Sequence, residues 1–157
     1  MPSVSKSLVT QDMINRKGVW GNERTSWPIC ESDIRRWAIA TYWPEKPLQI
    51  YWDEAYARTT RYGGIIAPPD FNPFAWPVDR PARPAAGGGR TGLNGGQTDT
   101  YGVPMRPGDI VRSRSRLKEW NEREGRMGLT LFTFTETEWR NQRDEWVKTR
   151  ISVGVRY

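Results

Sequence analysis

Hydrophobic and polar residues alternate through most of the last third of the chain, and this period of two predicts strands. Three runs show the alternation, at residues 109–120, 126–139 and 146–157, and polar segments at 121–125 and 141–144 separate them as turns. The last run places four branched apolar residues on one face: Val147, Ile151, Val153 and Val155. Consecutive hairpins of this kind predict an antiparallel meander.

The first half of the chain shows helical spacing instead. Apolar residues recur every three or four positions between residues 33 and 42, Ser32 precedes them as an N-cap, and Pro44 and Pro47 follow. Since serine caps a helix and proline cannot continue one, a helix is predicted over 33–42.

A second helix is predicted over residues 54–62. Asp53 is placed to cap its first turn, and the pair Gly63-Gly64 ends it. A buried apolar step at 65–67 and two prolines come next. Helices followed by a run of antiparallel strands define an α+β class with a helical layer on one face of one sheet.

The remaining segments have little periodicity. Pro73 and Pro77 exclude a long regular helix after residue 70, because an internal proline removes a hydrogen bond and clashes with the preceding turn. Residues 80–96 are rich in Pro, Gly and Ala and are expected to form a flexible loop, without the Lys-Ser/Thr ending of a phosphate-binding loop. Residues 1–12 are expected to be loosely held, and an extended arm is expected within 18–29.

Composition narrows the class of protein. A chain of 157 residues forms one domain most simply, and with no apolar run of membrane-spanning length we expect a cytoplasmic protein with no membrane partner. Cys30 is the single cysteine and histidine is absent, which excludes an internal disulfide and a His base and argues against any metal site. The net charge of +6 favours an anionic partner.

Four short motifs keep a characteristic order. They are Tyr-Trp-Asp-Glu at 51–54, Gly-Gly-Ile-Ile-Ala-Pro-Pro at 63–69, Arg-Pro-Gly-Asp at 106–109 and Asn-Gln at 141–142. From residue 32 to the end, the chain resembles the MaoC-like (R)-specific enoyl-CoA hydratases, and more closely the dehydratase-type amino-terminal domains of that hot-dog family. The resemblance implies a single hot-dog domain over 1–157 whose central helix is short or broken.

The family's catalytic dyad is missing. Its motif, Gly-Asp-x-Asn-Pro-Leu-His-x-Asp, aligns without gaps so that Lys46 stands for the catalytic Asp and Tyr51 for the catalytic His. A second alignment places Pro44 and Gln49 there instead. The resemblance therefore implies a non-catalytic subunit of a heteromeric enoyl-CoA hydratase. A second hot-dog subunit would carry the Asp and His, and the chain would need no cofactor besides the coenzyme A thioester as substrate.

The resemblance also suggests substrate-binding residues. They belong to the motifs at 51–54 and 63–69 and to the aromatic segment after residue 70, and they are Tyr51, Gly63, Gly64, Ile65, Ala67, Pro68, Phe71, Phe74 and Trp76. If prolines break the central helix, the acyl pocket is wide and the three aromatic residues line it, which predicts a bulky acyl group such as a steroid side chain or a long chain. Alternatively, the aromatic residues fill the missing helix's volume as core.

Basic residues recur at every second position of the first long strand. Arg112, Arg114, Arg116 and Lys118 thus share a face, either as a solvated row balanced by glutamates of the next strand or as contacts for coenzyme A phosphates. Arg58 and Arg61 are further phosphate candidates.

Two other functions compete with the hydratase subunit. A nucleic-acid-binding protein would explain the sequence pI near 9.8, but 18 acidic residues interrupt the basic ones and no nucleic-acid motif fits, so we expect no nucleic-acid partner. A hot-dog thioesterase or an acyl-CoA-binding scaffold is the other alternative. A thioesterase would need a carboxylate near the pocket, and Glu45 and Asp53 are the candidates.

Overall fold

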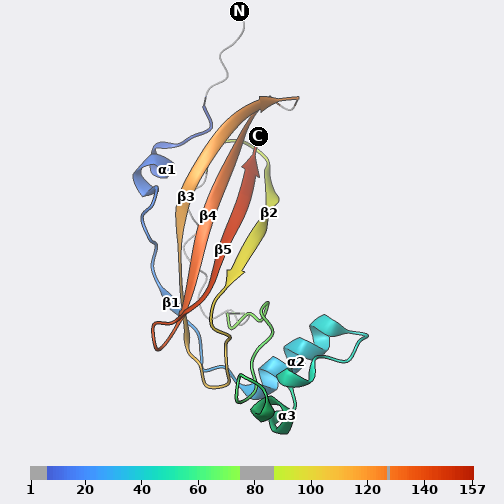
Figure 1. Ribbon diagram of the computed structural model, residues 1–157. Helices are drawn as coiled ribbons and strands as arrows, with labels where there is room; N and C mark the ends of the chain where they lie inside the picture. Colours follow the sequence, from blue (N-terminus) through green and yellow to red (C-terminus); the bar gives the residue numbers. More distant parts are fainter. Residues whose placement is uncertain (1–6, 75–86, 127) are drawn as a thin grey trace, which may run out of the picture.

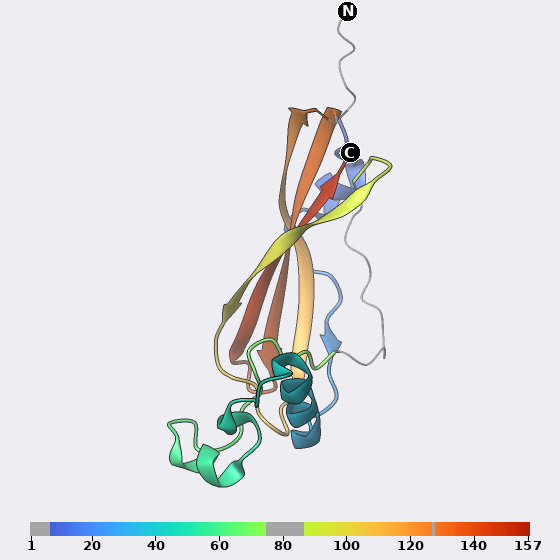
Figure 2. The ribbon, with the colours of Figure 1, turned by 90° about the vertical axis from the view of Figure 1, so that its right-hand side faces the viewer.

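The fold is built on one long, twisted antiparallel sheet (Figures 1 and 2). The computed structural model describes residues 7–74, 87–126 and 128–157. The five strands are β1 (Arg24–Thr25), β2 (Gly92–Tyr101), β3 (Val111–Gly125), β4 (Gly128–Asn141) and β5 (Trp146–Arg156). They lie in the order β1-β3-β4-β5-β2. The α+β class and the meander of the last three strands are confirmed.

β3 is longer than its pattern predicts. The polar stretch at 121–125, predicted as a turn, continues the strand: Asn121 pairs with Phe132 and Gly125 with Gly128. A register shift between Leu117 and Glu119 takes Lys118 out of regular pairing. The pairing partner on β4 therefore overrides the weak strand propensity of this stretch.

The expectation of a flexible loop over 80–96 is wrong for its last part. Residues 92–96 belong to β2, which pairs along β5, while residues 80–86 lie outside the described residues. Glycine is needed here for a packing reason: a Cβ on Gly95 would lie 2.9 Å from side-chain carbons of Val153 and Val155. Because β2 needs glycine where it approaches β5 closely, it lacks the β-branched and aromatic residues that normally indicate a strand.

The amino-terminal segment is held against β3. Thr10 caps α1 (Gln11–Arg16) by accepting from the Met13 backbone N–H, and Met13 is fully buried. The extended arm that follows is confirmed, since the backbone N–H of Gly21 donates to the Ser115 carbonyl and that of Ser26 to the Val111 carbonyl. Leu8 also contacts β3, since its backbone N–H donates to the Glu122 carboxylate at 2.6 Å. Residues 1–6 lie outside the described ranges, and the expected looseness of 1–12 stays a prediction.

Three helical elements gather at one end of the sheet (Figures 1 and 2). They are α2 (Glu31–Tyr42), the 3₁₀ turn η1 (Gln49–Tyr51) and α3 (Glu54–Thr59). The N-cap position of α2 is Cys30, whose side chain makes no capping hydrogen bond. Ser32 therefore lies inside the helix and is not its N-cap. α3 ends at Thr59, three residues before the predicted end. None of the helices in the described ranges is long and apolar enough to cross a membrane.

The core has two parts. The larger one joins Ile34 and Ala38 of α2 to Val111, Trp139 and other residues at the same end of the sheet. The smaller one places Met13 of α1 against Leu117 and Leu131 near the opposite end. The helical layer thus covers the ends of the sheet. Residues 71–74, around Pro73, are not helical, while Pro77 lies outside the described residues.

Polar side chains occupy the middle of the sheet face that carries this core, here called the inner face. Register places Ser113, Thr137 and Arg150 on it, beside Trp139 and Lys148. Ile151, Val153 and Val155 share the opposite face and are only half-buried. A register shift between Trp139 and Arg140 accompanies the burial of Val147, so that Val147 and its neighbour Lys148 are both buried. The predicted grouping of four residues therefore fails at Val147.

Candidate functional site

Two hollows meet at Lys148, which lines both. The smaller one, here the apolar cleft, has a volume of about 260 Å³, and the larger one, here the polar groove, about 510 Å³. The apolar cleft is lined by Tyr51, Tyr62, residues 66–69, residues 101–105, Val147 and Lys148. The polar groove is lined by Gly21, Asn22, Arg24, Trp37, Asp70, Asn72, residues 113–115, Thr137, Trp139, Lys148, Arg150 and Ser152.

The apolar cleft forms where the step after α3 reaches the sheet. The Ala67 backbone N–H donates to the Met105 carbonyl at 2.8 Å, and the Gly102 N–H donates to the Val147 carbonyl at 2.8 Å. Of the predicted substrate-binding residues, Tyr51, Ala67 and Pro68 line this cleft together.

Three other predicted substrate-binding residues, Gly63, Gly64 and Ile65, do not line the apolar cleft. Gly63 is exposed with a positive φ of 66° in the turn that follows α3, where its backbone N–H donates to the Thr60 carbonyl at 3.0 Å. Since the C-cap of α3 is Thr60, the Gly63-Gly64 pair does not end the helix as predicted. Ile65 is buried in the larger core. These two residues and Gly64 lie outside the linings of the polar groove and the apolar cleft.

Lys46 and Tyr51, at the family's catalytic positions, do not form an acid–base pair. The exposed Lys46 places its Nζ 4.5 Å from the centre of the Trp52 ring. Tyr51 is buried, with its ring 6.0 Å from that of Tyr42. Burial first, and then the hydrogen bond with Tyr42, raises the pKa of Tyr51 further above its ordinary value. The phenol therefore stays protonated at neutral pH and cannot act as a base there.

The nearby carboxylates do not replace the dyad. Asp53 caps α3 as predicted, accepting from the Tyr56 backbone N–H at 3.0 Å and from Gln49 Nε2 at 2.8 Å. These hydrogen bonds, led by the one from Gln49, lower its pKa. Glu45 is exposed, and neither carboxylate lines the polar groove or the apolar cleft.

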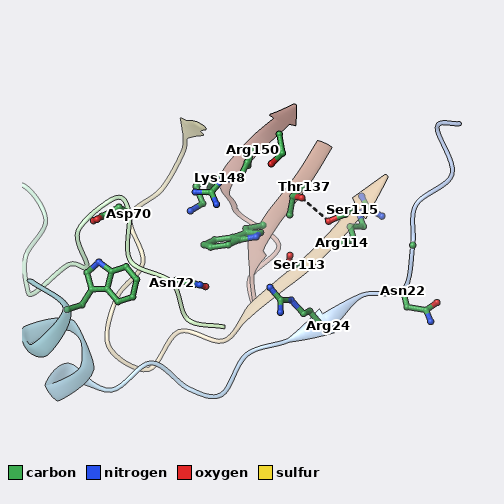
Figure 3. Close-up of a pocket in the computed structure, with 14 residues that line it drawn as sticks. Asn22, Arg24, Asp70, Asn72, Ser113, Arg114, Ser115, Thr137, Lys148 and Arg150 are labelled. Atoms are coloured by element: carbon green, nitrogen blue, oxygen red, sulfur yellow. Dashed lines mark hydrogen bonds between the residues drawn. The ribbon is translucent and has the colours of Figure 1, made fainter. Parts of the chain in front are cut away.

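The polar groove lies on the inner face, between the arm that includes β1 and residues 70–72 (Figure 3). Its hydroxyls are partly paired, since Ser115 and Thr137 share a hydrogen bond of 2.8 Å. Arg150 makes two hydrogen bonds of 2.7 Å to the Asp99 carboxylate. The pKa of Asp99 is lowered, chiefly by this hydrogen bonding. The Arg150 cation is therefore neutralised within the chain.

Lys148 is the most unusual group of the site. The residue is 1% exposed, and its Nζ lies 3.6 Å from the centre of the Trp139 ring. Its pKa is lowered to about 8, first by burial and then by the Arg150 cation, while Asp99 and Asp70 act in the opposite direction. Among the described residues, Lys148 makes no ion pair and no hydrogen bond through its side chain.

Two of the three predicted lining aromatics, Phe71 and Phe74, contact the larger core. Phe71 is 4% exposed and meets Trp37 edge to face at 5.6 Å. Phe74 meets Trp139 in the same way at 5.5 Å, with the Arg24 guanidinium 4.1 Å from its ring centre. Trp76 lies outside the described residues. Neither Phe71 nor Phe74 lines the polar groove or the apolar cleft, which favours the alternative interpretation that these aromatics are core.

The phosphate candidates on β3 are paired with acidic residues. Arg112 contacts Asp144 at 2.7 Å, Arg114 contacts Glu138 at 3.0 Å, and Arg116 pairs with Glu136. On α3, Arg58 pairs with Glu54 at 2.8 Å. Arg61 donates to the Tyr62 hydroxyl and is exposed. This pairing favours the solvated row over a phosphate site on β3.

Two of the motifs serve the fold. The buried carboxylate of Asp109 accepts from the Arg106 backbone N–H at 2.9 Å, from Gln142 at 3.2 Å and from Arg143 at 3.2 Å. Gln142 in turn accepts from the Ile110 backbone N–H at 3.0 Å. Arg-Pro-Gly-Asp and Asn-Gln thus connect the start of β3 to the β4–β5 turn.

One antiparallel sheet of this order, with α2, η1 and α3 at one end and with two hollows meeting beside the inner face, is the architecture of a hot-dog domain. A sequence model of the "FAS1-like, dehydratase domain region" matches residues 15–150. The chain therefore belongs to the family of FAS1-like dehydratase domains, and its fold is the hot-dog fold. A search of curated proteins by sequence found no match.

Solved structures share the fold at low identity. The ChsH1-ChsH2 complex from Mycobacterium tuberculosis matches with a TM-score of 0.74 and 18% identity, over 93% of this chain and 94% of that one. The MaoC-like dehydratase from Rhodospirillum rubrum matches with a TM-score of 0.63 and 20% identity, over 87% and 91%. The HadBC (3R-hydroxyacyl-ACP dehydratase) complex from M. tuberculosis matches with a TM-score of 0.60 and 14% identity, over 88% and 96%.

The residues that make the groove distinctive were not predicted from the sequence, namely Lys148, Trp139, Trp37 and Arg24. One signal was available. Lys148, Arg150 and Ser152 recur at every second position, so they share a face of β5. Only the tertiary structure shows that this polar face is the inner one.

Proposed function

We propose that the chain is a non-catalytic subunit of a heteromeric enoyl-CoA hydratase, in which it shapes the acyl pocket. The observation that carries the proposal is the replacement of the dyad by Lys46 and Tyr51, one exposed and the other a buried phenol with a raised pKa. General acid–base catalysis of hydration needs a group that titrates near neutrality. A partner subunit then supplies the Asp and the His, and this chain holds no cofactor.

The open edge of the sheet supports a partner. β2 is the last strand in the order, so one of its edges has no neighbour among the described strands, and most of its residues are exposed. Unpaired strand edges favour association with another chain. Two structures with the same fold are complexes of named subunits, ChsH1-ChsH2 and HadBC.

A bulky acyl group belongs to the same proposal. Together the apolar cleft and the polar groove offer room beyond that needed by a short chain, and they adjoin at Lys148. We propose that the apolar cleft, with Tyr51, Ala67 and Pro68, contacts the acyl group. We further propose that Arg61, which has no carboxylate partner in the described part of the chain, contacts a coenzyme A phosphate.

The test is reconstitution. The chain alone is expected to leave a bulky 2-enoyl-CoA unchanged, and mixing with a hot-dog subunit that carries the Asp-x-Asn-Pro-x-His pattern is expected to start hydration, measured as loss of the conjugated thioester absorbance. In the mixture, Tyr51→Phe should change KM more than kcat. A fall in kcat of about 10²-fold or more would assign Tyr51 a proton-transfer role and overturn the proposal.

A further inference from the structure

The polar groove contains hydrogen-bond donors that lack an acceptor in the described part of the chain. The indole Nε1 atoms of Trp37 and Trp139 are buried, and neither has a hydrogen-bond partner among the described residues. Both residues line the groove. Buried donors are satisfied in the great majority of folded proteins, so unpaired ones in a hollow indicate a missing acceptor.

The same groove contains two cations without a carboxylate partner. Within the described residues, neither Lys148 nor Arg24 makes an ion pair, whereas Arg114 and Arg150 of the lining are paired with Glu138 and Asp99. Burial lowers the pKa of both unpaired groups. Lys148, Arg24 and Asn72 project from β5, β1 and the 70–72 segment around a common space (Figure 3).

We propose that the polar groove is a binding site for the carboxylate group of a small-molecule ligand, with Lys148 and the indole N–H of Trp139 as its principal donors. A carboxylate offers about four lone-pair sites on two oxygens and one negative charge, which matches an ammonium and indole donors. The flat indole rings provide apolar contact for the carbon chain of the ligand. The site extends beyond the proposed hydratase role, because it concerns a second polar group that the pocket recognises.

Asp70 is the internal competitor for this site. Its exposed carboxylate lines the groove and acts on the Lys148 charge, but it makes no ion pair among the described residues. An external carboxylate must therefore work against the field of Asp70. Removal of that charge is expected to tighten binding.

The test is calorimetric titration of the full 157-residue chain with octanoate and with the neutral octanamide. Octanoate is expected to bind saturably and octanamide at least tenfold more weakly. Lys148→Met is expected to weaken octanoate binding at least tenfold, and Trp139→Phe, which removes the N–H and keeps an aromatic ring, at least threefold. Asp70→Asn is expected to strengthen it. Lys118→Met, at an exposed lysine of β3, is the matched control and should leave binding within twofold.

Three outcomes would overturn the proposal. They are equal binding of octanoate and octanamide, unchanged octanoate binding after Lys148→Met, and tighter binding of inorganic phosphate than of octanoate. Circular dichroism of each variant checks folding, and Trp139→Phe retains the test if Lys148→Met does not fold.

A second arm compares octanoyl-CoA with the coenzyme A thioester of the matching eight-carbon dicarboxylic acid. Tighter binding of the dicarboxylic thioester places the carboxylate on the acyl group, and equal binding assigns the site to a free acid. Neither arm measures hydration, so failure of the reconstitution leaves this test intact.

Discussion

Asp109 shows how a short motif acts at the scale of one residue. Its carboxylate is 2% exposed and connects three segments: the Arg106 turn, the start of β3 and the β4–β5 turn. A buried carboxylate is tolerated only when its lone pairs are occupied, and here three donors occupy them.

Replacement of Asp109 by Ala is expected to lower the free energy of unfolding by about 1–3 kcal/mol, since it removes the acceptor of the part-buried Arg106 backbone N–H and of the Gln142 and Arg143 side chains. Urea unfolding followed by circular dichroism measures this. Asp12→Ala is the control, because its ion pair with Arg16 is exposed, and the expected change is below about 0.5 kcal/mol. Equal losses in the two variants would refute the role of Asp109.

Lys148 predicts a particular dependence of stability on pH. Its pKa is about 8 in the folded chain and about 10.4 in an unfolded one, so between these values the unfolded state binds more protons. The free energy of unfolding therefore rises with pH over this window, by about 1–3 kcal/mol, and the full penalty of the buried charge is present below pH 8.

Urea titrations at about pH 7 and about pH 9.5 measure this rise, since they lie on either side of most of the window. Lys148→Met should lack this rise, so the difference in the free energy of unfolding between variant and wild type should change with pH. The loss of the contact with Trp139 shifts the free energy of unfolding of the variant equally at both pH values and does not affect this comparison. Lys118→Met should keep the wild-type slope. A wild-type slope in Lys148→Met would mean that another group titrates.

At the scale of the element, the caps of the two main helices differ. α3 has the predicted Asp53 cap, while α2 begins at Cys30, whose backbone is extended (φ −92°, ψ 142°) and suits a cap, but whose side chain makes no capping hydrogen bond. A side chain at position 30 that accepts a capping hydrogen bond would therefore stabilise the amino terminus of α2.

Cys30→Ser is expected to stabilise the protein by about 0.5–1 kcal/mol, because the hydroxyl can accept from a backbone N–H of the first turn. Thermal unfolding measures the gain. Ser32→Ala is the matched control at the position that the sequence favours as the cap, and it should change stability little. A loss after Ser32→Ala larger than the gain after Cys30→Ser would restore Ser32 as the cap.

At the scale of the whole molecule, the net charge of +6 is less available than its size suggests. Arg112, Arg114 and Arg116 of β3 pair with Asp144, Glu138 and Glu136. Arg114 and Arg116 also lie over the Trp20 ring at 4.4 and 4.3 Å. A surface of paired charges is a weak attractor of polyanions.

The chain is therefore expected to bind duplex DNA more weakly than about 10⁻⁴ M at physiological salt, the weak limit of non-specific binding. Fluorescence anisotropy with a labelled duplex checks this. A variant with both Glu136→Gln and Glu138→Gln frees two arginines and should bind more tightly. Tight, salt-sensitive binding by the wild type would favour the nucleic-acid alternative.

The sequence by itself determined the elements whose signals are local. Alternation identified β3, β4 and β5, helical spacing with Asp53 and the prolines identified α2 and α3, and the order of short motifs identified the hot-dog family. The absence of histidine was enough to exclude a complete Asp-His dyad within this chain. Each of these conclusions depends on neighbours within a few residues or on composition.

Only the tertiary structure decided the rest. β2 was not recognised because Gly95 is chosen for close approach to Val153 and Val155 on β5, and the extension of β3 past residue 120 depends on pairing with β4. The burial of Lys148 was equally hidden, since period two separates the faces of a strand but does not reveal which face lies inward. Packing partners distant in sequence determine the inner face. They also determine the groove that Lys148 and Arg24 line together with two indoles that have no hydrogen-bond partner in the described ranges.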